Sequence, residues 1–163
     1  MLNRKNKSVF NKHGFTLMEL LVVISVIAIT AAVGFVALDP ASRIDDAKNS
    51  ARWTDVSAIV NAIKTDQVDN GGSYLTSIAN ATSSLNFVIG TATTGCDSGC
   101  GAITTQTTCV SLAGIVTEGY MGVIPVGPDS GAAATQTSYY LTKATTGNIK
   151  ISACASTTIA ITK

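Results

Sequence analysis

The chain has few charged residues and a single histidine, and both shortages limit what it can do. Charged residues make up 13% of its 163 residues, about half the usual share. The one histidine, His13, lies near the N-terminus, so the rest of the chain has no side chain whose unperturbed pKa is close to neutral. This nearly excludes histidine-dependent catalysis. Hydrophobic residues make up 46%, which argues against a disordered chain.

Several functional motifs are also missing. The sequence has no phosphate-cradling glycine loop, no nucleophile elbow and no paired carboxylates, so we expect no catalytic residues. After Gly14 the chain holds seven basic and ten acidic residues, and residues 70–163 hold only Lys143, Lys150 and Lys163 as bases. Without a basic stripe to engage phosphates, no nucleic-acid partner is expected.

One long apolar run is present. Residues 20–38, LLVVISVIAITAAVGFVAL, carry no formal charge, and about 20 such residues at ~1.5 Å each span a bilayer core. By the positive-inside rule, the basic residues before the run place the N-terminus in the cytoplasm and everything after Asp39 outside. We therefore expect a single pass through the inner (cytoplasmic) membrane, N-in and C-out. The basic residues are Arg4, Lys5, Lys7 and Lys12.

Three interpretations of this run compete: a discarded signal peptide, an ordinary anchor, or a leader whose apolar stretch is kept. The run is too long for a signal peptide, and no clear A-x-A site closes it. Glu19 stands at its edge. This carboxylate either reaches the membrane interface or enters an apolar environment, at a cost of about 2.5–3.5 kcal/mol near a bilayer centre unless a cation pairs with it. Physical chemistry alone leaves the last two interpretations open.

The residues around Glu19 favour the retained leader. Residues 14–24, GFTLMELLVVI, closely resemble the N-terminal motif of type IV pilins and of the pseudopilins of type II secretion. A short basic leader ends in Gly, an aromatic residue follows, a Glu lies five positions beyond the Gly, and an apolar helix comes next. The resemblance implies that a prepilin peptidase cleaves between Gly14 and Phe15 and that the new Phe15 amine is N-methylated.

The same resemblance implies a role for Glu19 in assembly. In this family the carboxylate is thought to pair with the Phe15 amine of a neighbouring subunit, and a buried polar contact of this kind can fix register. Small residues let transmembrane helices approach closely, and Ala28, Ala31, Ala32 and Gly34 are the candidates for helix packing. The implied partners are the peptidase/methyltransferase, an inner-membrane platform protein, an assembly ATPase and further copies of the chain in a helical filament.

Apolar residues continue with helical spacing after the anchor. They form one stripe from residue 44 to residue 63, with charged residues largely between them. Asp39-Pro40 indicates either an N-cap followed by proline at the first helical position or a kink inside one long helix. We expect bending or unwinding in the assembled state between Gly34 and Pro40. Asp69-Asn70-Gly71-Gly72 should end the helix. The stripe consists of Ile44, Ala47, Ala51, Val56, Ile59, Val60 and Ile63.

Residues 70–163 are rich in Ser, Thr, Ala and Gly and contain short alternating runs typical of strands. Residues 145–148, TTGN, predict a hairpin turn. The fold class we expect is α+β: a long N-terminal α-helix, membrane-spanning in its first half and amphipathic in its second, packed on a small antiparallel β-sheet head. The strand candidates are residues 85–89, 109–112, 120–124, 138–143, 148–153 and 157–162.

The four cysteines lie beyond the anchor, and an even number in an exported head predicts two disulfides. Three connectivities are possible; we favour Cys96–Cys100 and Cys109–Cys154. The cysteine spacings do not fit a zinc site, so no metal ligands are assigned. Asp97, Glu118 and Asp129 offer oxygen ligands for Ca²⁺, but three scattered acids are a poor match to a calcium site. No cofactor is expected, and Ca²⁺ is kept as a minor alternative.

These observations predict four segments: a cleaved leader at 1–14, a transmembrane and filament-core helix at 15–38, an amphipathic helix at 39–69 and a disulfide-bearing head at 70–163. The favoured function is a non-enzymatic structural subunit that polymerises into a type IV pilus on the cell surface. A pseudopilin of a type II secretion or DNA-uptake machine is the first alternative. A plain membrane-anchored extracytoplasmic binding module is the second.

Overall fold

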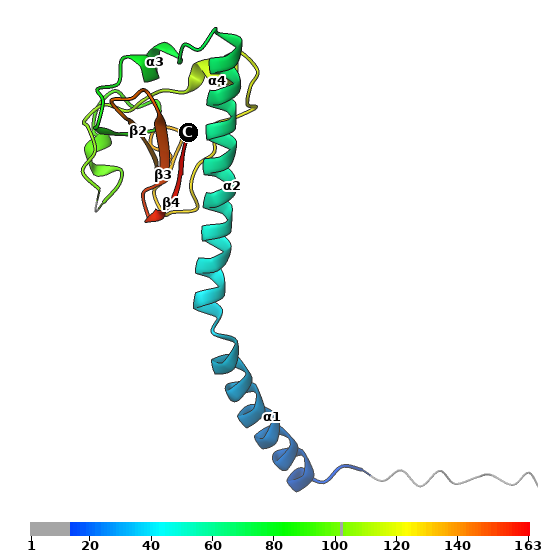
Figure 1. Cartoon of the computed structure of the whole chain (residues 1–163). Coiled ribbons are helices and arrows are strands. Elements are labelled where there is room, and N and C mark those ends of the chain that lie inside the picture. Colours follow the sequence, from blue (N-terminus) through cyan, green and yellow to red (C-terminus); the bar gives the residue numbers. More distant parts are fainter. Residues whose placement is uncertain (1–13, 102) are drawn as a thin grey trace, which may run out of the picture. The chain divides into compact units, whose positions relative to one another are not determined.

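The structure, a computed structural model, describes residues 14–101 and 103–163. The basic residues of the predicted leader and His13 therefore lie outside the described residues. The chain divides into two compact units, Met1–Arg43 and Ile44–Lys163, and each is described by itself. The first contains α1 (Leu17–Leu38) and the beginning of α2 (Pro40–Asp69), and the second contains the rest of α2 and the head (Figure 1).

The first unit is built around α1, which has no buried residue. It is apolar enough, and at 22 residues or about 33 Å long enough, to cross a membrane. Its two hydroxyl side chains donate hydrogen bonds inside the helix: Ser25 to the Leu21 carbonyl at 2.7 Å and Thr30 to the Val26 carbonyl at 3.0 Å. Because these hydroxyls are satisfied within the helix, they add little to the cost of placing α1 in hydrocarbon.

Helical backbone is interrupted at Asp39. This residue has φ 39° and ψ 70°, in the left-handed region, and caps the C-terminus of α1. A residue before proline is sterically disfavoured in the α region, and proline itself is well suited to the first position of a helix. Pro40 is the first residue of α2. Of the two interpretations of Asp39-Pro40, the structure matches the start of a new helix at Pro40.

Helix α2 packs on the head through its C-terminal half. Buried Val56, Ile59, Val60 and Ile63 follow the predicted stripe. The first part of that stripe, Ile44, Ala47 and Ala51, is exposed in the single chain, so that part of the prediction is wrong for the isolated subunit. The helix ends at Asp69 as expected. Gly71, with φ 63°, takes the left-handed backbone that glycine tolerates, and this lets Gly72 donate its N–H to the Gln67 carbonyl at 2.7 Å and close the helix.

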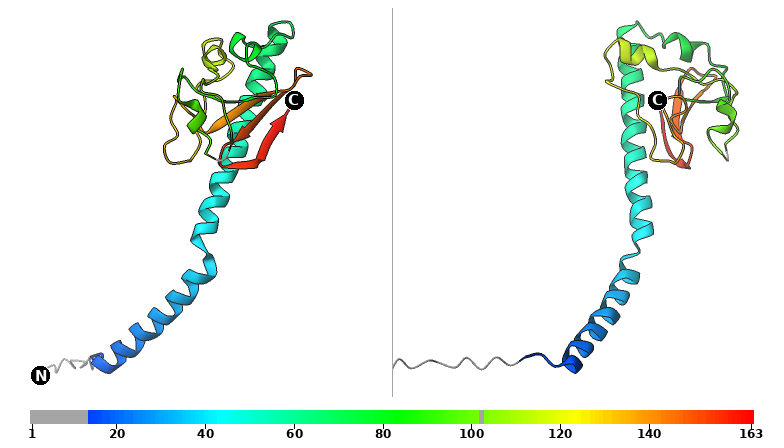
Figure 2. Two further views of the ribbon diagram at one scale, coloured as in Figure 1. Left: turned by 90° about the vertical axis from the view of Figure 1, so that its left-hand side faces the viewer. Right: turned by 180° about the vertical axis from the view of Figure 1, so that it is seen from behind.

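The head contains one four-stranded antiparallel sheet in the order β1-β2-β3-β4. Its strands lie beside α2 (Figures 1 and 2), and the fold class predicted from the sequence is confirmed. Gly147, with φ 91°, lies in the turn between β2 and β3, where the sequence predicts a hairpin. The strands are β1 (Asn86–Val88), β2 (Tyr139–Lys143), β3 (Ile149–Ala153) and β4 (Ser156–Thr162).

Two strand predictions are wrong. Residues 109–112 form only one isolated bridge, between Val110 and Ile89, because the disulfide at Cys109 comes before it and α4 (Ala113–Thr117) begins directly after it. Residues 120–124 pack irregularly against the core. Glycines flank and interrupt that run, and Pro125, which follows it, has no N–H to donate to a ladder. Apolar residues in both segments therefore contact the core without forming a strand.

A polar network joins α2 to the head. The guanidinium of Arg52 donates to the Asp129 carboxylate (Nη2 to Oδ1, 2.5 Å) and to Asn49 Oδ1 at 2.7 Å. The Tyr139 hydroxyl donates to Asp55 Oδ2 at 2.5 Å. Burial, together with this hydrogen bond and the negative charge of Asp55, raises the pKa of Tyr139. Arg52, expected among the polar residues between the apolar positions, is instead buried, because it has a carboxylate partner on the head.

The structure joins all four cysteines in two disulfides, Cys96–Cys109 and Cys100–Cys154. Both favoured pairings, Cys96–Cys100 and Cys109–Cys154, are therefore wrong. The backbone explains the difference: Cys96 donates its N–H to the Thr107 carbonyl at 3.0 Å and accepts from Thr105 Oγ1 at 2.8 Å. These bonds align Cys96 against the segment that ends at Cys109. Cys100 instead lies beside Cys154, which directly follows β3, with a Cα–Cα distance of 4.7 Å.

Candidate processing and assembly site

The predicted cleavage point lies in non-helical backbone. Gly14, Phe15 and Thr16 precede α1 and belong to no helix or strand. Phe15 is 78% exposed, and a side chain added at Gly14 would meet nothing within 4 Å. A peptidase must reach and extend the backbone of its substrate, and a bond inside a helix would first have to unwind. In the described chain, the Gly14–Phe15 bond is accessible and lies outside any helix.

Glu19 lies in the first turn of α1, and Thr16 positions that turn. Thr16 is the N-cap, and its hydroxyl oxygen accepts the Glu19 backbone N–H at 3.1 Å. A negative side chain in the first turn is favoured by the helix dipole. Sequence reasoning missed Thr16, although Thr-x-x-Glu before an apolar run is the signature of a capping box and could have found it. Cleavage after Gly14 would leave the new amine one residue before this cap.

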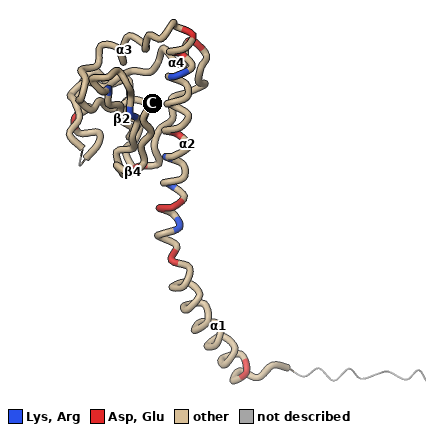
Figure 3. Tube along the Cα trace, in the orientation of Figure 1, with Lys and Arg blue, Asp and Glu red and all other residues tan. Residues whose placement is uncertain are grey.

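The charge distribution makes Glu19 stand out. It is the only acidic or basic residue in α1, and the rest of the helix carries no charge (Figure 3). Buried carboxylates require a partner. Among residues 15–38, the only cation that processing can supply is the amine of Phe15.

The four predicted packing residues do not share one narrow stripe. At about 100° per residue, Ala28, Ala31 and Ala32 lie on one face of α1, while Gly34 lies next to Ala31 and further round the helix. All four are exposed. A side chain at Gly34 would meet nothing within 4 Å in the single chain, so the structure places these residues on free helix surface. Their contacts in an assembly stay a prediction.

Comparison with protein-family models adds an independent observation about this segment. Residues 9–35 carry the prokaryotic N-terminal methylation motif. This is the leader type of type IV pilins and pseudopilins, as the sequence predicted. The methylation motif covers Gly14, Phe15, Glu19 and the four small residues; residues 9–13 of the match lie outside the described structure. The motif does not reach α2 or the head. Comparison with curated proteins and with solved structures finds no match.

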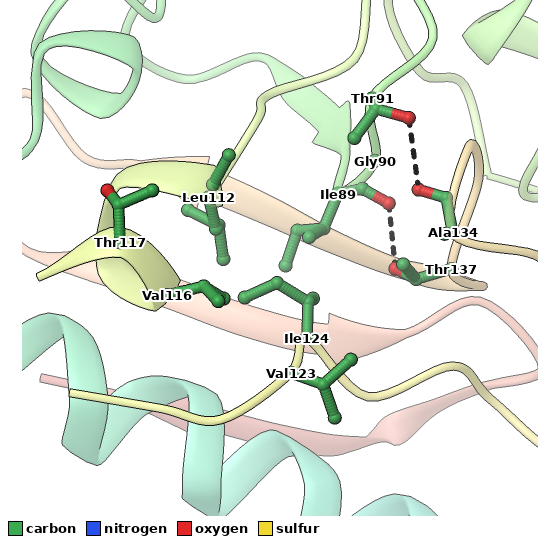
Figure 4. A pocket seen from close by; sticks show the side chains of 11 residues that line it. Ile89, Gly90, Thr91, Leu112, Val116, Thr117, Val123, Ile124, Ala134 and Thr137 are labelled. Atoms are coloured by element: carbon green, nitrogen blue, oxygen red, sulfur yellow. Dashed lines mark hydrogen bonds between the residues drawn. The ribbon is translucent and has the colours of Figure 1, made fainter. Parts of the chain in front are cut away.

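The head contains an apolar cavity, which lies outside the methylation motif. Its volume is about 280 Å³, and no titratable residue lines it (Figure 4). The threonine hydroxyls in its wall bond to the backbone: Thr137 to Ile89 at 2.7 Å, Thr117 to Gly114 at 2.9 Å, and Thr91 to Ala134 at 3.5 Å. The wall thus offers no acid, base or free hydroxyl for chemistry.

The three acids considered as calcium ligands are not brought together. Asp129 is held by Arg52, Asp97 lies in the short 3₁₀ helix η1 (Cys96–Ser98), and Glu118 follows α4. Across residues 14–101 and 103–163, no three His, Cys, Asp or Glu side chains are grouped to hold a metal ion.

Proposed function

We propose that this chain is a structural subunit that polymerises into a type IV pilus after cleavage at Gly14 and N-methylation of Phe15. The observation that carries the proposal is the methylation motif at residues 9–35, on a helix that buries none of its own residues. An unpartnered apolar helix must be covered by lipid or by other protein. The leader indicates that α1 meets both, first in the membrane and then in a filament.

The two charges of the cleaved segment determine the axial position at which each subunit joins the fibre. After cleavage, the segment from Phe15 to Leu38 carries one amine and one carboxylate, that of Glu19. A charge that enters an apolar bundle is tolerated only when it is neutralised. Each incoming subunit neutralises its charges by pairing with its neighbours. Chains in the wrong register leave unpaired charges in the apolar core, so the pair selects one axial position.

The remaining assignments follow from this role. Before assembly the subunit lies in the inner membrane, N-in and C-out, anchored by α1. The prepilin peptidase/methyltransferase acts on its leader, and a platform protein and an assembly ATPase move it into the fibre. Ala28, Ala31, Ala32 and Gly34 let neighbouring α1 helices approach closely. The interruption at Asp39 marks where the helical backbone adapts as subunits pack.

Isolation of surface fibres tests this function. An antibody against the head should label fibres sheared from cells that express the full chain. Deleting the gene should remove the label. The favoured role requires label along the full length of long surface fibres. Label confined to the envelope would indicate the pseudopilin alternative. A head that remains in the membrane fraction, with its leader attached and no fibres formed, would contradict both filament roles and indicate the plain anchor.

A further inference from the structure

An acidic cavity lies at the C-terminal end of α2, within the unit that contains the head. Its volume is about 260 Å³. It is lined by the end of α2, by the segment that follows it and by the residue after α4, and no basic residue is among them. Most of the lining residues carry side-chain oxygen atoms. The lining consists of Asp66, Asn70, Ser73, Tyr74, Leu75, Thr76 and Glu118.

Asp66 is the unusual member of this lining. It is only 1% exposed. Its Oδ1 accepts from Asn70 Nδ2 at 2.8 Å, whereas its Oδ2 has no hydrogen-bond partner among the described residues. Burying a carboxylate without a counter-charge is costly, and natural proteins compensate with a paired cation or a metal ion.

The described chain does not supply that cation. The ion pair found among the described residues joins Arg52 to Asp129. Lys64, two residues before Asp66, donates to Gln67 Oε1 at 2.8 Å and to the Tyr74 hydroxyl at 3.0 Å. Both of these hydrogen bonds of Lys64 therefore go to uncharged side chains.

Glu118 supplies the second carboxylate of this lining. The available donors are carboxylate, amide, hydroxyl and carbonyl oxygens, which suit a hard cation. Ca²⁺ accepts such mixed and irregular sets more readily than Mg²⁺ does.

We propose that Asp66 and Glu118 bind a Ca²⁺ ion in this cavity, with neutral oxygens of the segment after α2 and water as further ligands. The site goes beyond the filament role and does not depend on it. Because only two carboxylates contribute, its affinity should be weak, in the range of roughly 10⁻⁴–10⁻³ M found in extracellular modules. The bound ion would join the end of α2 to the residue that follows α4.

Tb³⁺ luminescence can detect such a site, because Tyr74 lines the cavity and can transfer excitation to the ion. The full chain in detergent micelles is stripped with a chelator, titrated with Tb³⁺ while tyrosine is excited, and then titrated with CaCl₂. We expect saturable emission that Ca²⁺ displaces. The absence of saturable, Ca²⁺-displaceable emission would overturn the proposal, whatever the outcome of the fibre experiments.

Matched variants place the ion. Asp66→Asn keeps an oxygen acceptor for Asn70 and removes the charge, so binding should weaken by about tenfold or more. Glu118→Gln changes an exposed side chain; it should also weaken binding, and it keeps the test decisive if the Asp66 variant fails to fold. Asp97→Asn changes an exposed residue of η1; it is the control and should bind as the original chain does. The site would be refuted if a folded Asp66→Asn chain or the Glu118→Gln chain bound the ion as the original chain does. It would also be refuted if the control lost binding to the same extent as these variants.

Discussion

Replacing Glu19 with leucine should leave the protein in the membrane and nearly abolish fibres. The substitution lengthens the apolar run, so insertion of α1 is unaffected or improved. In the assembled state it leaves the Phe15 amine of a neighbour without its partner. Breaking a buried pair in this way costs about 3–5 kcal/mol, which weakens each addition step by about a hundredfold or more. The measurement compares the amount of subunit in sheared fibres with the amount in membranes.

Asp39→Asn is the matched control for this experiment. Asp39 also flanks α1, at the opposite end, and asparagine tolerates the left-handed backbone found there. The control loses one carboxylate without touching the proposed pair, so its fibre yield should stay close to that of the original chain. Fibres of normal amount and symmetry from Glu19→Leu would show that the pair does not set the register.

Removing either disulfide should destabilise the head strongly. The Cys100–Cys154 bond closes a separation of 54 residues and the Cys96–Cys109 bond one of 13. In the chain-entropy model, these loops correspond to about 4 and about 3 kcal/mol of stabilisation. The paired alanine variants should lose free energy of unfolding by about these amounts. Urea titration of the full chain in micelles, followed by fluorescence of the only tryptophan, Trp53, measures the loss; a change below about 1 kcal/mol in either variant would contradict the model.

Thiol titration separates the observed pairing from the one favoured by sequence. A chain with Cys96→Ala and Cys109→Ala should contain no free thiol, because Cys100 and Cys154 remain bonded to each other. A chain with Cys96→Ala and Cys100→Ala should contain two free thiols. Under the other pairing, that second chain would contain none. The two double variants are matched in number and type of substitution, so unrelated losses of stability affect them similarly.

Local signals predicted much of the fold. The apolar run before Asp39, the helical spacing around Ile59 and the turn at Gly147 each depend on neighbouring residues, and each is found in the structure. The cysteine pairing depends instead on how the loop before Cys109 folds back over Cys96. No spacing in the sequence encodes that contact.

Buried polar residues were the harder part of the site. Arg52 and Asp66 are charged residues of the kind that usually faces solvent on a helix, yet both are buried. Arg52 is buried because Asp129, 77 positions away, accepts its hydrogen bond. Asp66 lines a cavity at the end of α2 together with Glu118, the residue after α4. Such partners come from tertiary packing, whereas Thr16 acts three residues from Glu19 and was available to sequence reasoning.

The most direct test of the account is the intact mass and N-terminal sequence of the subunit in isolated fibres. The account predicts a chain that begins at Phe15 and carries one methyl group on its α-amine, because only cleavage creates the cation that Glu19 requires. Subunits in working fibres that still begin at Met1, without cleavage or methylation, would contradict it.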